Sequence, residues 1–212
     1  NCWFPFDFMV GQAATKNVDI LFFSGDQIYE NRPTLTDTAA TPAEDYLYKF
    51  LLWHWAFQSL TSQYPSILQT DDHDVYHSDL YGQDRLGNTG SPGNGGFQRS
   101  FDFLENFVQK TMTAHNPDTL EPTPSARTGL SHYYTAFDYG GVSFFILEDR
   151  KYKRGPATTE TGYPETFLGA TQLEHLRDWA CTPMPGKRKC VLAQTIYASM
   201  SLSGAGTFTN DS

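Results

Sequence analysis

The stretch Val18–Asp26, with the sequence VDILFFSGD, joins an apolar run to a polar turn and indicates the fold class. Its first six residues are apolar except for Asp19, and it ends in a Ser-Gly-Asp turn. An apolar run without polar alternation is typical of a strand that is buried on both faces of a sheet. The sequence therefore predicts a buried strand at Val18–Phe23 that delivers Asp26 to the end of the sheet.

A helix and a second strand are predicted next along the chain. A capping box with Pro at the first helical position begins at Thr41. We expect the helix to run to about Ser62, because apolar residues recur at helical spacing. Its expected buried face consists of Tyr46, Phe50, Trp53, Ala56, Phe57 and Leu60. Pro65 ends the helix, and Ser66–Thr70 is a short predicted strand that leads into Asp71-Asp72-His73-Asp74.

The rest of the chain continues the alternation of helices and strands. The predicted elements are an irregular loop at Gly82–Gly96, a helix at Phe97–His115, two strands at His132–Asp138 and Val142–Glu148 with a hairpin turn between them, a helix at Leu168–Ala180 and a strand at Lys189–Ile196. This order predicts an α/β fold, with a layered mixed sheet flanked by helices. The length of 212 residues fits a single domain over residues 1–212.

Charge and hydropathy exclude two classes of function. The net charge of -9 argues against nucleic-acid binding, because a phosphate backbone would be repelled. A small phosphorylated substrate remains compatible, since bound cations reverse the local field. The mean hydropathy is -0.47, and no apolar run approaches the ~20 residues that span a bilayer, so no membrane span is expected.

The ends and the cysteines carry weaker signals. The chain begins with Asn1 and ends in a small polar stretch without a closing element, so we expect it to be part of a longer protein. Cys181 and Cys190 flank a turn-rich segment. They form either a short disulfide loop, in an oxidising compartment, or two unpaired thiols.

Three polar clusters follow predicted strands, at Gly25–Glu30, Asp71–Asp74 and Glu148–Arg150. Ligands bind at the carboxyl ends of strands in α/β sheets, because side chains converge there. Each cluster alone also fits an ordinary turn, a helix cap or a local ion pair. Together they favour a site for hard cations such as Ca²⁺ or Fe³⁺, since neighbouring carboxylates repel one another without a cation.

Four motifs resemble those of the PhoD-like alkaline phosphatases, which belong to the calcineurin-like metallophosphoesterase superfamily. GDQIYE is similar to the family's Gly-Asp-x-Ile-Tyr-Glu, and TDDHDV is similar to its Asp-Asp-His-Glu/Asp motif. LEDRKYK resembles its Leu-Asp-Thr-Arg-x-Tyr segment, and LGATQLEHLRDW resembles its Leu-Gly-x-x-Gln helix. The motifs occur in the family's order, and the resemblance implies a calcineurin-like fold that is incomplete at the C-terminus.

The resemblance implies metal ligands at four positions. Asp26 would bridge two metal ions, and Tyr29 would bind a ferric ion through its phenolate. Cys2 stands where the family has a cysteine ligand, although Asn1 replaces the usual serine before it. Asp72 would bind the second metal ion.

The remaining implied roles are catalytic. His73 would act near the leaving oxygen of the substrate, and Asp74 would orient its imidazole. Arg150 would hold a phosphate oxygen, while Glu148 stands where the family has Asp. The family's later Gly-Asp-x-His segment does not occur in this chain. We therefore expect the 212 residues alone to have little activity.

The resemblance thus implies hydrolysis of phosphate esters by a metal-bound hydroxide. The implied cofactors are Fe³⁺ and Ca²⁺, the implied partner is a small phosphorylated substrate, and the implied location is extracytoplasmic. Two alternatives remain at this point: another two-metal hydrolase of the superfamily, and a secreted Ca²⁺-binding module without turnover. A tyrosinate–Fe³⁺ colour would separate the iron-containing enzyme from a site that holds only Ca²⁺.

We predict that Cys2→Ser weakens iron retention in the full-length protein. A thiolate binds iron far more strongly than a serine hydroxyl, which is not ionised at neutral pH. The measurement is the iron content of purified protein, with Cys190→Ser as the matched control. Unchanged iron content in Cys2→Ser would contradict the role of Cys2 as an iron ligand.

Overall fold

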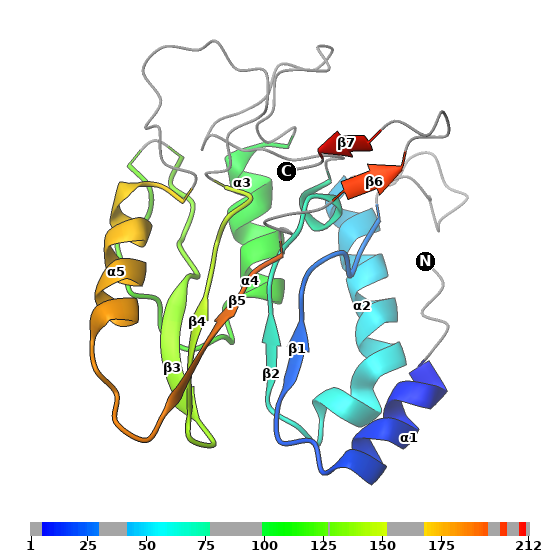
Figure 1. Ribbon diagram of the computed structural model, residues 1–212. Helices are drawn as coiled ribbons and strands as arrows, with labels where there is room; N and C mark the ends of the chain where they lie inside the picture. The colour runs from blue at the N-terminus through cyan, green and yellow to red at the C-terminus, as the bar shows by residue number, and fades with distance from the viewer. Residues whose placement is uncertain are drawn as a thin grey trace.

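The computed structural model describes residues 6–29, 42–76, 99–126, 128–151, 168–194, 200–202 and 208–210. These residues form helices and three small sheets, so the predicted α/β class is confirmed at this level (Figure 1). Helices α1 and α2 lie on one flank in this view and α5 lies on the other, with the strands between them. Within the described residues, no helix is long and apolar enough to cross a bilayer.

The strands that lead to the polar clusters run in the same direction. β1 (Leu21–Phe23) pairs in parallel with β2 (Ser66–Leu68). β3 (Thr135–Tyr139) and β4 (Val142–Ile146) form the predicted antiparallel hairpin, and β5 (Arg188–Leu192) pairs in parallel with β4. Figure 1 shows β1, β2, β4 and β5 all ending toward the upper part of the molecule. A third, antiparallel pair is formed by β6 (Met200–Leu202) and β7 (Phe208–Asn210).

The first strand is shorter and less buried than the sequence predicts. The prediction for Val18–Phe23 was wrong in its burial, because Phe22 is 36% exposed. Side chains alternate between the two faces of a strand. Leu21 and Phe23 pack against the large core, whereas Phe22 points to the other face. An apolar run therefore does not establish that both faces are covered.

The helices agree better with their predicted bounds. α2 (Pro42–Thr61) ends within one residue of its predicted end, and α5 (Ala170–Cys181) lies at the predicted place. The predicted helix at Phe97–His115 is helical over the described residues 101–112, as α3 (Phe101–Phe103), a π-helical segment η2 (Leu104–Gln109) and α4 (Lys110–Met112). α1 (Phe6–Lys16) was not predicted.

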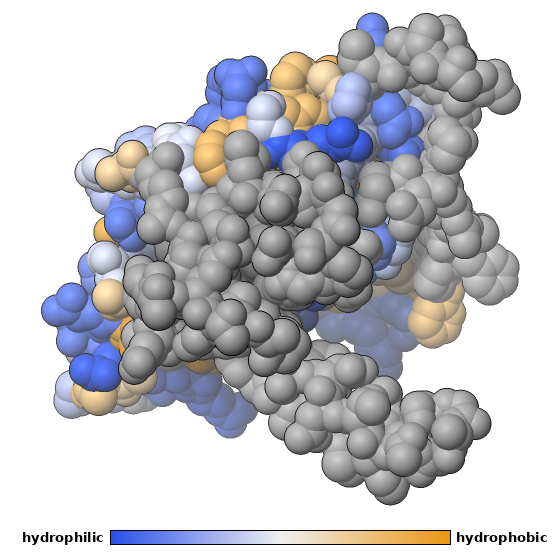
Figure 2. All heavy atoms as spheres, turned by 90° about the horizontal axis from the view of Figure 1, so that it is seen from above, coloured by the Kyte–Doolittle hydropathy of each residue, from blue (hydrophilic) through white to orange (hydrophobic). Residues whose placement is uncertain are grey.

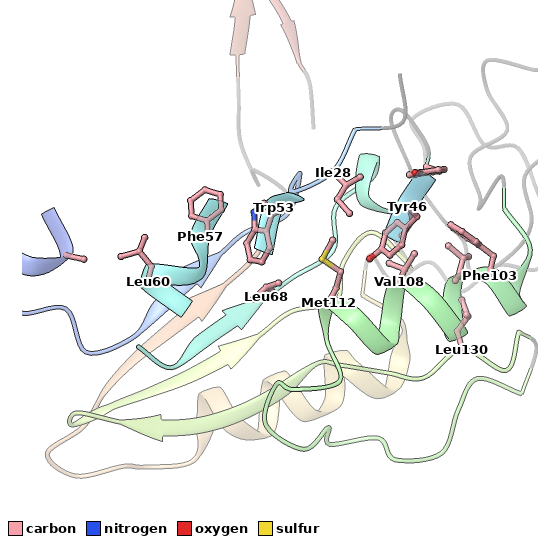
Figure 3. Close-up of a cluster of buried hydrophobic side chains, with 14 residues drawn as sticks. Ile28, Tyr46, Trp53, Phe57, Leu60, Leu68, Phe103, Val108, Met112 and Leu130 are labelled. Atoms are coloured by element: carbon pink, nitrogen blue, oxygen red, sulfur yellow. The ribbon is translucent and has the colours of Figure 1, made fainter. Parts of the chain in front are cut away.

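The large hydrophobic core lies between α2, the helical stretch at 101–112 and β2 (Figure 3). The predicted buried face of α2 is confirmed at its centre, since Trp53 is 2% exposed and packs edge-to-face on Phe23 at 5.0 Å between ring centroids. Ile28, from the first polar cluster, points into the same core and is fully buried. The core therefore holds the first cluster in place.

Two glutamine side chains join the β1–β2 pair to the β3–β4–β5 sheet at their carboxyl ends. The amide of Gln69, directly after β2, donates to the carbonyl of Leu147 at 2.6 Å. The amide of Gln194, after β5, donates to the carbonyl of Thr70 at 2.7 Å and to the hydroxyl of Tyr133 at 2.5 Å. These contacts bring the residues that follow β4 close to the residues that follow β2.

Two further expectations concern cysteines and loops. Cys181 and Cys190 are free thiols, so the alternative of two unpaired cysteines is the correct one. The predicted loop at Gly82–Gly96 and the capping residue Thr41 lie outside the described residues.

We predict that Trp53→Ala lowers the free energy of unfolding by about 3–5 kcal/mol, because it leaves a cavity in the large core. The matched control is Trp55→Ala on the same helix, since Trp55 is 71% exposed and its loss should change stability by less than about 0.5 kcal/mol. Chemical denaturation monitored by circular dichroism measures both values. Equal losses in the two variants would contradict the placement of the core.

Candidate metal centre

The turn after β1 has a backbone that only certain residues adopt. Gly25 has φ of 96° and Asp26 has φ of 59°, both in the left-handed region. Asp is one of the residues most tolerant of this region, whereas Gly enters it without strain. A side chain at Gly25 would place its Cβ 2.4 Å from the Cβ of Asp71. The two turns therefore approach so closely that only glycine fits at this position.

The turn after β2 presents two carboxylates side by side. Asp72 caps the short 3₁₀ helix η1 (His73–Val75), with its Oδ1 accepting from the backbone N–H of His73 at 3.0 Å. The Oδ1 of Asp71 accepts from the backbone N–H of Asp72 at 2.9 Å. These local bonds fix both side chains at the strand end, on the side that faces the first turn.

Asp74 ties the two turns together. Its side chain is fully buried, and its Oδ2 accepts backbone N–H groups from Asp26 at 2.7 Å and from Asp71 at 3.0 Å. Its Oδ1 accepts the N–H of Ile28 at 2.9 Å. The role inferred from the family resemblance, orientation of the His73 imidazole, stays a prediction. The contacts of the carboxylate give Asp74 a role in shaping the Asp26 turn.

Three carboxylates converge where these turns meet. Asp26, Asp71 and Asp72 each offer an oxygen, and the three oxygens lie within 4.8 Å of one another. The Oδ1 of Asp26 is buried and has no hydrogen-bond partner among the described residues. A buried, unpaired carboxylate oxygen in an all-oxygen donor set suits a hard cation such as Ca²⁺. The residues present therefore fit a metal ion.

Tyr29 and His73 lie together beside the carboxylates. The hydroxyl of Tyr29 donates to the Oδ2 of Asp26 in a short hydrogen bond. Its ring stacks on the imidazole of His73, with 4.1 Å between centroids and 25° between planes. Burial, and then the neighbouring Asp26, raise the pKa of the Tyr29 hydroxyl above its usual range. In the absence of a cation this group is therefore a neutral phenol.

Arg150 reaches the cluster from the turn after β4. Its Nε forms an ion pair with the Oδ1 of Asp71, and its Nη2 lies 4.0 Å from the Oδ2 of Asp72. Burial acts to lower the pKa of the guanidinium, but the charges of Asp71 and Asp72 outweigh it, so that the pKa is raised. Arg150 is thus a permanent cation at the edge of the carboxylate group.

The carboxylates bind protons more tightly than usual. Burial raises the pKa of Asp71 to about 6, against an opposing effect of Arg150. Burial, with a contribution from Asp72, also raises the pKa of Asp26. Burial raises the pKa of Asp74 well above its usual range, although the backbone N–H groups act to lower it. Bound cations would remove this energetic penalty on the ionised forms.

The structure brings the predicted residues together. Asp26, Tyr29, Asp72 and His73 converge, although about 45 residues separate the two motifs, and the prediction that they share one place is confirmed. Their individual roles in binding and catalysis stay predictions. Cys2 lies outside the described residues, so its role as a ligand stays a prediction too.

Sequence reasoning gave Asp71 no individual role and missed the roles of the glutamines. Asp71 was placed in the second polar cluster, with a solvated or capping residue as the alternative, but it was given no individual role. The structure places it in the carboxylate group and pairs it with Arg150. Its position beside Asp72 at a strand end was the signal available. Gln69 and Gln194 gave no signal, because a glutamine in an apolar strand has no characteristic spacing.

A comparison with protein families identifies the chain. A family model described as PhoD-like phosphatase matches residues 4–207. The chain belongs to the PhoD-like phosphatase family. Comparisons with curated proteins and with solved structures gave no match. Membership supports a phosphatase, a metal-dependent hydrolase of phosphate esters, and the PhoD-like match covers all the residues of the carboxylate cluster.

The described surface near this end is mainly polar. Figure 2 looks down on the end of the molecule at which the site strands finish, and the described residues around its rim are mostly hydrophilic, with smaller hydrophobic areas.

We predict that Gly25→Ala lowers the affinity for Ca²⁺ at least tenfold, because the new Cβ forces the two turns apart. Gly186→Ala is the matched control, since Gly186 has φ of 79° but nothing lies within 4 Å of the place that a Cβ would occupy there. The control should lose only about 1–2 kcal/mol of folding stability from the left-handed backbone, and its affinity for Ca²⁺ should stay at the wild-type value. Calorimetric titration with Ca²⁺ measures the affinity, and equal affinities in the two variants would contradict the close approach.

We predict that Ca²⁺ raises the melting temperature more at pH 8 than at pH 5. The pKa of Asp71 is raised to about 6 in the folded protein, from 3.8 in the unfolded chain. Between these values the folded state binds more protons, so the ion-free protein loses stability as pH rises through this window. A cation binds the ionised form and restores the loss. Melting curves with EDTA and with Ca²⁺ measure the effect.

Asp71→Asn is the control for this prediction. The amide cannot ionise, so the loss of ion-free stability between pH 4 and 6 should become smaller. An unchanged pH dependence in Asp71→Asn would assign the effect to other groups.

Proposed function

We propose that this chain carries the main part of a site that hydrolyses phosphate esters with a metal-bound hydroxide. The observation that supports it is the convergence of Asp26, Asp71 and Asp72 beside the cation Arg150 and the imidazole of His73. Negative ligands for a cation and a positive group for a phosphate therefore lie next to each other. This pairing is what hydrolysis of an anionic ester requires.

The metal ions would be held by Asp26, Tyr29, Asp72 and Cys2, with Fe³⁺ and Ca²⁺ as the proposed pair. When bound, they would lower the pKa of a coordinated water enough to supply hydroxide near neutral pH. The proposed ligands are mostly oxygen donors, which suit both ions. The short contact between Tyr29 and Asp26 supports a shared ion, because the two oxygens already lie together.

The other residues act on the substrate. Arg150 would hold a non-bridging phosphate oxygen through its planar guanidinium. His73 would donate a proton to the departing alkoxide, and its ring is held for this purpose against Tyr29. Asp74 would hold the turn at Asp26 through its backbone hydrogen bonds. It would also orient the imidazole of His73.

The finer assignment of the fold belongs to the same proposal. We infer that the β1–β2 pair and the β3–β4–β5 sheet are parts of a calcineurin-like layered sandwich. The bonds from Gln69 and Gln194 across the two sheets support it. An extracytoplasmic location is also proposed, from the family resemblance.

The experiment measures hydrolysis by the full-length protein, loaded with iron and Ca²⁺, of an aryl phosphomonoester, an alkyl phosphomonoester and an aryl phosphodiester. We expect turnover of at least one. Asp26→Asn should abolish it together with metal binding. His73→Asn should lower the rate by about 10²–10⁴-fold for the alkyl ester and much less for the aryl ester, whose leaving group needs no proton.

Asp19→Asn is the control, because Asp19 is exposed just before β1, away from the carboxylate group. It should leave turnover unchanged. Cation binding without hydrolysis of any ester would favour the alternative of a Ca²⁺-binding module. A visible tyrosinate–Fe³⁺ band that disappears in Tyr29→Phe would support iron at Tyr29, and its absence from iron-loaded protein would contradict that assignment.

A further inference from the structure

The turn that carries Arg150 is buried on both sides of this residue. Glu148, Asp149 and Lys151 are 2%, 0% and 3% exposed. The side chain of Arg150 is 19% exposed and extends toward Asp71. Burial of ionisable side chains is costly unless they are paired and hydrogen-bonded. The contacts of these buried groups therefore determine how the backbone at Arg150 is held.

Glu148 is held by two other elements of the fold. Its backbone N–H donates to the side-chain oxygen of Gln172 in α5 at 2.8 Å, and its carbonyl accepts from the amide nitrogen of Gln172 at 2.9 Å. Its Oε2 accepts the backbone N–H of Tyr133, just before β3, at 3.1 Å. Glu148 thus fixes the end of β4 against α5 and against the start of β3.

Lys151 fixes the other side of the turn. Its Nζ lies 3.4 Å from the Oε1 of Glu148 and donates to the carbonyl of Ser131 at 3.1 Å. Burial acts to raise the pKa of Glu148, but Lys151 and then His132 outweigh it, so that the pKa of this carboxyl group is lowered. The ion pair between residues 148 and 151 spans Arg150 and closes the turn beneath it.

We propose that Glu148 is the positioning residue for Arg150. The buried pair with Lys151 and the double hydrogen bond with Gln172 fix the backbone from which the guanidinium extends to Asp71 and Asp72. Because the turn is already ordered, Arg150 can bind a phosphate oxygen without a further loss of conformational entropy in the turn. The inference rests on the proposed function, which assigns the substrate phosphate to Arg150. The role of Glu148 is to position Arg150, and it is not that of a metal ligand.

The first test measures inhibition by inorganic phosphate and the values of KM and kcat in the metal-loaded, full-length protein. Glu148→Gln should raise KM and the inhibition constant of phosphate tenfold or more, with metal content unchanged. In the Arg150→Ala background the same substitution should have no further effect, because Glu148 acts through Arg150. Asp138→Asn is the control: this carboxylate also pairs with a lysine, at the far end of the same hairpin, and it should leave both constants unchanged.

A wild-type KM and phosphate inhibition in folded Glu148→Gln would overturn the proposal, and so would an effect that adds fully to that of Arg150→Ala. If Glu148→Gln does not fold, Gln172→Met replaces it. That variant removes both bonds to the Glu148 backbone without leaving a buried charge, and the same non-additive increase is expected.

A second test does not depend on turnover. The pair Asp71–Arg150 should show a non-additive shift of melting temperature in a cycle of Asp71→Asn and Arg150→Met in ion-free protein. In the Glu148→Gln or Gln172→Met background this non-additive part should disappear. If it persists, Glu148 does not position Arg150. If it disappears while the wild type neither binds phosphate nor hydrolyses esters, the positioning holds and the proposed function fails.

Discussion

The buried carboxylate of Asp74 is the contact on which the site depends. It accepts N–H groups from Asp26 and Ile28, more than forty residues earlier, and from Asp71 in its own turn. Hydrogen bonds to a charged group contribute about 1.5–3 kcal/mol each, which offsets only part of the cost of burial, because burial still raises the pKa of Asp74 well above its usual range. The left-handed backbone at Gly25 and Asp26 persists because these bonds and the packing of Ile28 define it.

The second constraint is the alignment of the β1–β2 pair with the β3–β4–β5 sheet. Gln69 and Gln194 cross between the strand ends, and Glu148 with Lys151 then holds the turn from which Arg150 extends. Gln69, Glu148 and Lys151 are buried, and Gln194 is half-buried. All four side chains are hydrogen-bonded or ion-paired, so they favour one arrangement of their neighbours. The cation of Arg150 consequently comes to the carboxylates from a sheet other than the one that carries them.

The electrostatics of the site follow from this convergence. Carboxylates that are drawn together and partly buried bind protons more tightly, as the raised pKa of Asp71 shows. Arg150 compensates part of the charge, and a divalent or trivalent cation would compensate the rest. A bound cation would relieve the repulsion between the carboxylates that the fold brings together. Ion binding is therefore linked to pH and to the stability of the two turns.

By itself, the sequence determined the α/β class, the bounds of α2 and α5, the β3–β4 hairpin, and Asp26, Tyr29, Asp72 and His73 as members of one site. The helices and strands follow from local periodicity, and the polar clusters follow from the ends of strands. The choice of Asp26, Tyr29, Asp72 and His73 within these clusters followed from the family resemblance. The tertiary structure alone decided that Phe22 is exposed, that α1 is a helix, that Asp71 pairs with Arg150, and that Gln69 and Gln172 bind the backbone at the end of β4. The contacts of Asp71 with Arg150 and of Gln69 with Leu147 form only when the sheets pack, and no spacing in the chain encodes them.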